Sequence, residues 1–167
     1  KGITMKKTIL FVLAAYAMLA SAVKIVASAT MQDAIYPIII MFICVAIIIW
    51  HMLHALSYTK KEAPVKELYR RDFYSKLYLI PFYILIVVWG FGFAMAPLGF
   101  IFLPFLFVLD YIVLLSSSAY GFAGLIHERR QGTISSLSQK IHIIMHILLF
   151  LDFFSSFSLW ERTNYPD

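Results

Sequence analysis

Residues 77–126 read LYLIPFYILIVVWGFGFAMAPLGFIFLPFLFVLDYIVLLSSSAYGFAGLI, an apolar stretch in which Asp110 is the one charged side chain. Pro97 and Gly99 interrupt it, because Pro cannot continue a helix and Gly relaxes the backbone. Each half is long enough to cross a hydrocarbon core of roughly 30 Å at about 1.5 Å per residue. The stretch therefore predicts two antiparallel membrane-spanning helices joined by a tight turn.

Apolar runs of similar length lie on both sides of this hairpin. With them, the chain has five runs that predict spanning helices, at residues 8–29, 34–56, 77–96, 98–126 and 141–160. Hydrophobic residues make up 62% of the chain and charged residues 14%. A water-soluble domain of that composition would expose apolar surface that it could not cover. We therefore expect an all-α, polytopic membrane helix bundle that forms a single domain over residues 1–167.

Lys and Arg fall on alternate sides of the five runs. They gather before the first run, between the second and third, and between the fourth and fifth. Loops enriched in Lys and Arg stay in the cytoplasm. We therefore expect a multi-pass protein of the plasma membrane, with its N-terminus in the cytoplasm and its C-terminus outside.

The segment between the second and third runs has an amphipathic pattern. From Pro64, which suits a first helical position, apolar residues fall on one helical face and cations on the other. This pattern predicts an interfacial helix on the cytoplasmic leaflet, in contact with anionic lipid headgroups or a partner. The candidate contact residues are Lys60, Lys61, Lys66, Arg70 and Arg71. A solvated loop that only sets the topology is the alternative.

Three ionisable residues lie inside the predicted spans. Asp110 and Asp152 fall close to the expected bilayer midplane, and Lys24 falls nearer the outer end of the first span. A charge in hydrocarbon costs roughly 2.5–3.5 kcal/mol, so each residue calls for a partner or a function. One interpretation is a proton- or cation-coupled site, because two close carboxylates do not easily both ionise. The other is a set of hydrogen bonds that fix helix packing.

The five histidines suggest a second candidate site. One pair lies three residues apart on the second run and another lies four apart on the fifth, so each pair shares a helix face. In the expected topology all five lie near the cytoplasmic boundary, where they favour zinc, iron or an axially held haem. The candidate ligands are His51, His54, His127, Glu128, His142 and His146. Alternatively, the imidazoles bind lipid phosphates and helix ends at the interface.

Two segments carry a resemblance to other proteins. Residues 120–126, reading Tyr-Gly-Phe-Ala-Gly-Leu-Ile, and the stretch from His142 to Asp152-Phe153 lie on either side of a basic loop. Together they resemble uncharacterised small multi-span membrane proteins of Gram-positive bacteria. The resemblance implies a bacterial plasma membrane and brings no activity with it.

Signatures of common enzyme chemistry are absent from the sequence, which has neither a Gly-rich phosphate-binding loop nor a Ser nucleophile elbow. We expect a small non-enzymatic membrane protein, a subunit or accessory component of a transport, export or membrane-resistance assembly. It would act as a homo-oligomer or with a membrane partner subunit, without a cofactor or nucleic acid. One alternative is a redox subunit with a His-ligated metal or haem. Another is a proton-coupled carrier that uses the Asp pair.

Overall fold

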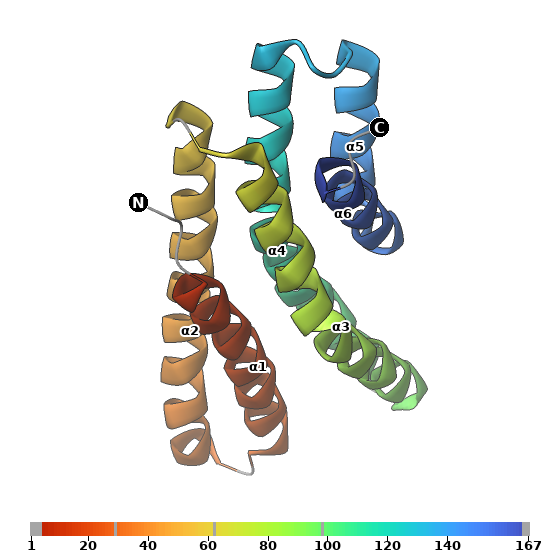
Figure 1. Ribbon diagram of the computed structural model, residues 1–167. Coiled ribbons are helices and arrows are strands. Elements are labelled where there is room, and N and C mark those ends of the chain that lie inside the picture. The colour runs from red at the N-terminus through yellow and green to blue at the C-terminus, as the bar shows by residue number, and fades with distance from the viewer. Residues whose placement is uncertain (1–4, 29, 62, 98, 165–167) are drawn as a thin grey trace.

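The computed structural model describes residues 5–28, 30–61, 63–97 and 99–164. They form an all-α structure of helices joined by short connections, as predicted (Figure 1). The helices are α1 (Lys6–Ala27), α2 (Met31–Ser57), α3 (Val65–Met95), α4 (Leu103–Gln131), α5 (Ser136–Ile147) and α6 (Leu149–Asn164). Single turns of 3-10 helix, η1 (Tyr58–Lys60) and η2 (Gly99–Ile101), lie in the connections.

Four of these helices, α1 to α4, are long and apolar enough to cross a membrane. They overlap the first four predicted runs. Helices α1 and α2 form one antiparallel pair and α3 and α4 form another, and the pairs meet where α2 packs on α4 and α1 packs on α3. This arrangement indicates a multi-pass membrane protein.

Local sequence explains the turns of both hairpins. The hydroxyl oxygen of Thr30 caps α2 by accepting a hydrogen bond from the Asp33 N–H at 3.2 Å, and the hydroxyl donates to Asp33 Oδ2 at 2.6 Å. Between α3 and α4, a Cβ atom on Gly99 would overlap the carbonyl group of Phe93, so the close approach of the chain requires glycine. The predicted break is confirmed here, although residue 98 lies outside the described residues.

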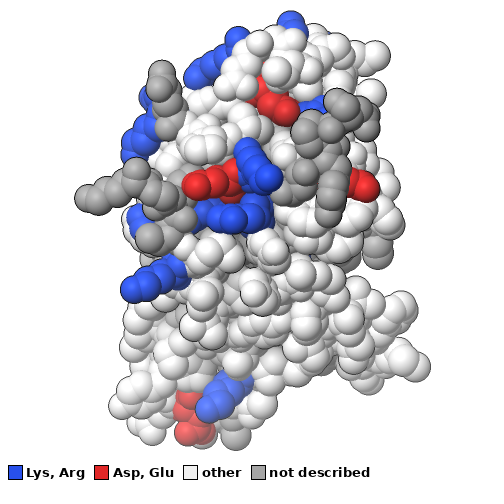
Figure 2. All heavy atoms as spheres, viewed as in Figure 1, with Lys and Arg blue, Asp and Glu red and all other residues white. Residues whose placement is uncertain are grey.

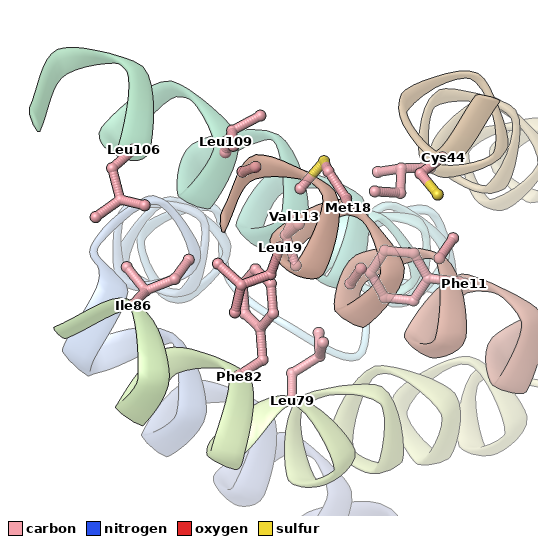
Figure 3. Close-up of a cluster of buried hydrophobic side chains, with 14 residues drawn as sticks. Phe11, Met18, Leu19, Cys44, Leu79, Phe82, Ile86, Leu106, Leu109 and Val113 are labelled. Carbon is pink, nitrogen blue, oxygen red and sulfur yellow. The ribbon is translucent and has the colours of Figure 1, made fainter. Parts of the chain in front are cut away.

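The four long helices pack around an apolar core (Figure 3). Its labelled members are Phe11, Met18, Leu19, Cys44, Leu79, Phe82, Ile86, Leu106, Leu109 and Val113. The outer faces are equally apolar, since large side chains such as Phe42, Val88 and Phe107 are at least 60% exposed. Faces of this kind are suited to lipid rather than to water.

The predicted separate interfacial helix after residue 64 is wrong. Its residues are the first part of α3, which runs without a break from Val65 to Met95. Its 31 residues span about 46 Å, so the helix is longer than the roughly 30 Å hydrocarbon core. The first half packs against α4 and α6, where Arg71, Asp72 and Lys76 are all at most 2% exposed.

The predicted continuous helix at 141–160 is also wrong. Leu148 adopts an extended conformation and divides the segment into α5 and α6, of 12 and 16 residues, each too short to cross roughly 30 Å. Helix α6 turns back along α3, and Arg162 pairs with Glu128 at the end of α4. The described end of the chain therefore lies beside the α4–α5 loop, and not at the opposite end as expected. Polar side chains explain the turn, because they find partners on α3 and α4.

Lys and Arg concentrate toward one end of the molecule. In Figure 2 most of the blue side chains lie over the upper part of the visible face, where α2 ends and α3 begins in Figure 1. The lower part is nearly uncharged, apart from a neighbouring blue and red pair at the bottom. This distribution agrees with the loops that were predicted to be cytoplasmic, although sidedness itself stays a prediction.

Candidate functional site

The strongest candidate site is a buried charged centre where α3, α4, α5 and α6 meet. Lys76 lies in the middle of this centre, and the Lys76 side chain is 2% exposed. The ammonium group donates to Asp72 Oδ2 at 3.1 Å, one helical turn earlier on α3, and pairs with Asp152 from α6. It also donates to the hydroxyl of Ser156. A cation removed from water in this way needs such partners, because an unpaired buried charge is strongly unfavourable.

Asp152 joins the centre to two further helices, α4 and α5. Its Oδ1 atom accepts a hydrogen bond from the Ser118 hydroxyl at 2.9 Å and lies 2.6 Å from His146 Nδ1. That same nitrogen lies 3.0 Å from Lys76 Nζ. Gly121 gives the imidazole its room, because a Cβ atom there would lie 2.8 Å from His146 Nε2. The centre therefore ties α5 and α6 to α3 and α4.

The charges of the centre do not balance without His146. One ammonium group and the carboxylates of Asp72 and Asp152 give a net charge of −1 when all three are ionised. A proton on His146 would bring the sum to zero. In a low-dielectric interior such close charges interact strongly, so the packing of the four helices depends on the whole group.

A cavity of about 160 Å³ adjoins the centre. It is lined by Lys76, Ile80, Tyr83, Ile84, Asp152 and Phe153. The hydroxyl of Tyr83 is buried and lies near the side chain of Ser117 on α4. Tyr83 therefore places a polar group in the wall of this cavity, which Asp152 also lines.

The structure separates the ionisable residues predicted inside the membrane. Asp152 pairs with Lys76 at the start of the apolar part of α3, whereas Asp110 lies further along the α3–α4 hairpin, beside a second cavity. Lys24 is exposed in the last turn of α1. The partners of Asp152 are Lys76, Ser118 and His146, on α3, α4 and α5.

The histidines have individual partners rather than a shared site. His51 Nδ1 lies 3.2 Å from the Ser116 hydroxyl, and the ring stacks on Phe11. His54 Nε2 lies 2.7 Å from Lys7 Nζ. Among the described residues, no group of three or more His, Cys, Asp or Glu side chains is placed to hold a metal ion. The predicted ligands are therefore not brought together.

The remaining candidate ligands also have local partners. His127 Nε2 lies 2.6 Å from the carbonyl oxygen of Tyr58, which continues the end of α2. His142 Nδ1 lies 2.9 Å from the Ser155 hydroxyl, and burial lowers the pKa of His142 below its ordinary value. Glu128 accepts a hydrogen bond from the Tyr69 hydroxyl at 2.6 Å.

Of the predicted lipid-contact residues, one is placed elsewhere. Lys60, Lys61, Lys66 and Arg70 are exposed, as lipid or partner contact requires. Arg71 is buried, donates to the Tyr120 hydroxyl at 3.1 Å and lies over its ring. Its Nη2 atom has no hydrogen-bond partner among the described residues.

Sequence reasoning missed the middle of the site. Lys76 was grouped with the cations that set the topology, and Asp72 was not singled out. One signal was available, because Asp72 and Lys76 are four residues apart, on the same face of a helix. Nothing in the sequence indicated that this pair contacts α6, because the contact depends on the turn at Leu148.

The family model described as a family of unknown function, DUF6652, matches residues 2–165. The chain therefore belongs to this family. Neither the search of curated proteins nor the search of solved structures found a match.

Proposed function

We propose that this protein is a small non-enzymatic subunit or accessory component of a transport, export or membrane-resistance assembly in the bacterial plasma membrane. The proposal is supported by the pairing within the charged centre. Lys76, Asp152 and His146 hold one another and the helices that carry them.

On this proposal the chain crosses the membrane four times, and both described ends lie in the cytoplasm. The basic loops favour the cytoplasm, and Arg162 lies beside Glu128, next to one of these loops. On this proposal the hairpin of α5 and α6 enters the cytoplasmic leaflet and returns. Its outer face is apolar, as contact with lipid or a partner helix requires. The exposed side chains of that face are Leu137, Ile141, Ile144, Leu148, Leu151 and Phe154.

The experiment that tests the assembly role uses Lys76→Met. The substitution leaves the carboxylates of Asp72 and Asp152 buried without their cation, which costs about 3–5 kcal/mol. We expect α6 to detach, and the complex with partner or second copy to be lost. Lys6→Met is the control, because Lys6 is an exposed cation outside the predicted contact residues.

The measurement is the mass of the native complex after extraction in mild detergent with its own lipids. We expect wild type and Lys6→Met to exceed the 19.2 kDa of a single chain, and Lys76→Met to dissociate. A wild-type protein that is monomeric in its native lipids would overturn the assembly role.

A second candidate function is a proton-coupled carrier. The observation that favours it is the buried hydroxyl of Tyr83, which lines the same cavity as Asp152. A hydroxyl beside a buried carboxylate can take part in moving a proton.

A further inference from the structure

The groove between α3 and α4 is separate from the charged centre and has one ionisable residue. Its volume is about 280 Å³, and its lining consists of Ile86, Val87, Gly90, Phe91, Ala94, Leu103, Leu106, Phe107 and Asp110. Val87, Phe91 and Phe107 are 44%, 70% and 65% exposed, so the groove opens toward the lipid. Helices α5 and α6 cover only the other end of α3 and α4, as Figure 1 shows.

Asp110 forms the polar end of this apolar groove. Its side chain is 5% exposed, and its Oδ1 atom is buried without a hydrogen-bond partner among the described residues. Asp152 differs in this respect, because Lys76, Ser118 and His146 all contact it. A buried carboxyl oxygen without a donor is unfavourable in hydrocarbon, so a ligand that supplies a donor or a cation gains from binding there.

We propose that this groove binds an amphipathic organic cation, with its protonated amine on Asp110 and its apolar body between α3 and α4. Charge complementarity selects the amine, and the apolar lining selects a hydrophobic body. The volume lies at the lower end of small-molecule pockets, so a single ring system with a short alkyl chain fits it. The opening toward lipid means that the ligand enters from the bilayer.

Gly90 is a second position at which a substitution can test the same groove. A Cβ atom there would lie 3.8 Å from Leu106 Cδ2, which is ordinary contact, so the backbone tolerates a side chain. Gly90→Leu therefore fills the groove and leaves Asp110 in place. Gly92→Leu is the matched control, since a Cβ atom on Gly92 meets nothing within 4 Å and Gly92 is not part of the groove lining.

The test is photolabelling of the full chain in nanodiscs of phosphatidylcholine. The probe is an arylethylamine that carries a photoreactive diazirine on its ring, and the matching alcohol is the neutral analogue. We expect the amine to label peptides from residues 86–107. Asp110→Asn and Gly90→Leu should each reduce this labelling by at least about tenfold. Asp110→Glu should retain part of it, whereas Gly92→Leu and Asp33→Asn should label like wild type.

Three results would overturn the proposal. They are equal labelling by the alcohol, labelling that survives Asp110→Asn, and a groove closed to the amine by a second copy of the chain. Native mass spectrometry of the same nanodiscs identifies the last case, in which Gly90→Leu converts a dimer to a monomer. The isolated chain is used without partners, so failure here leaves the assembly role standing, and loss of assembly leaves amine binding intact.

Discussion

At the residue scale, glycines on α4 determine how closely the neighbouring helices can approach it around the charged centre. Gly121 and Gly124 on α4 lie under His146 and Tyr69, so closely that a Cβ atom on either would come within 3.0 Å of the neighbouring ring. In the sequence these glycines resemble ordinary helix-packing residues of membrane proteins. Their particular partners come from α3 and α5, so the sequence could predict that they pack closely but not what they pack against.

Gly121→Ala and Gly92→Ala are expected to change stability in opposite directions. At Gly121 the added methyl group would lie 2.8 Å from His146 Nε2 and 3.0 Å from Asp72 Cγ, an overpacking that costs about 1–3 kcal/mol. At Gly92 it meets nothing within 4 Å, so the gain in helix propensity of about 1 kcal/mol remains. Unfolding of both variants in one detergent measures the difference. Equal stabilisation by both would contradict the packing of His146 on α4.

At the element scale, the sequence predicted the long spans well because hydropathy and length are properties of a single segment. The sequence did not predict the division into α5 and α6, because that division depends on contacts with other helices. The run at 141–160 has the length and apolar character of a span, but its histidine, aspartate and serine side chains find partners on α3 and α4. Hydropathy counts apolar residues and does not register such hydrogen bonds.

The α5–α6 hairpin predicts that residues at its two ends react from the same side of the membrane. Single cysteines at Leu137, Thr163 and Thr30, in a Cys44→Ala background, are labelled with a membrane-impermeant maleimide. We expect Leu137→Cys and Thr163→Cys to react in inverted vesicles and Thr30→Cys to react in intact cells. If Thr163→Cys reacted together with Thr30→Cys, the last segment would cross the membrane and the hairpin would be refuted.

At the scale of the whole molecule, polarity is arranged along the long axis of the helices. Exposed cations lie toward one end, buried charged groups lie beneath them, and the far half of α3 and α4 is apolar except for Asp110. Hydropathy and the positions of Lys and Arg along the sequence predicted the apolar spans and the charged end, whereas the partners of the buried charges required the packed structure.

If the protein carries protons, purified chains in liposomes should take up protons when a potassium gradient with valinomycin sets the membrane potential. Tyr83→Phe removes the hydroxyl in the wall of the cavity that Asp152 lines, and is expected to slow this uptake by at least about tenfold. A trapped pH-sensitive dye measures the rate, and Tyr36→Phe, at an exposed tyrosine, is the control. Wild-type vesicles that match protein-free vesicles would exclude the carrier.

The turn at Leu148 also bears on how the chain is made. During synthesis α3 and α4 leave the ribosome before α5 and α6 do, so Lys76 and Asp72 first fold with no Asp152 to meet them. Neither α5 nor α6 is long enough for the insertion machinery to retain as a span. The α5–α6 hairpin is thus positioned by helices already in place, and its docking brings Asp152 to Lys76.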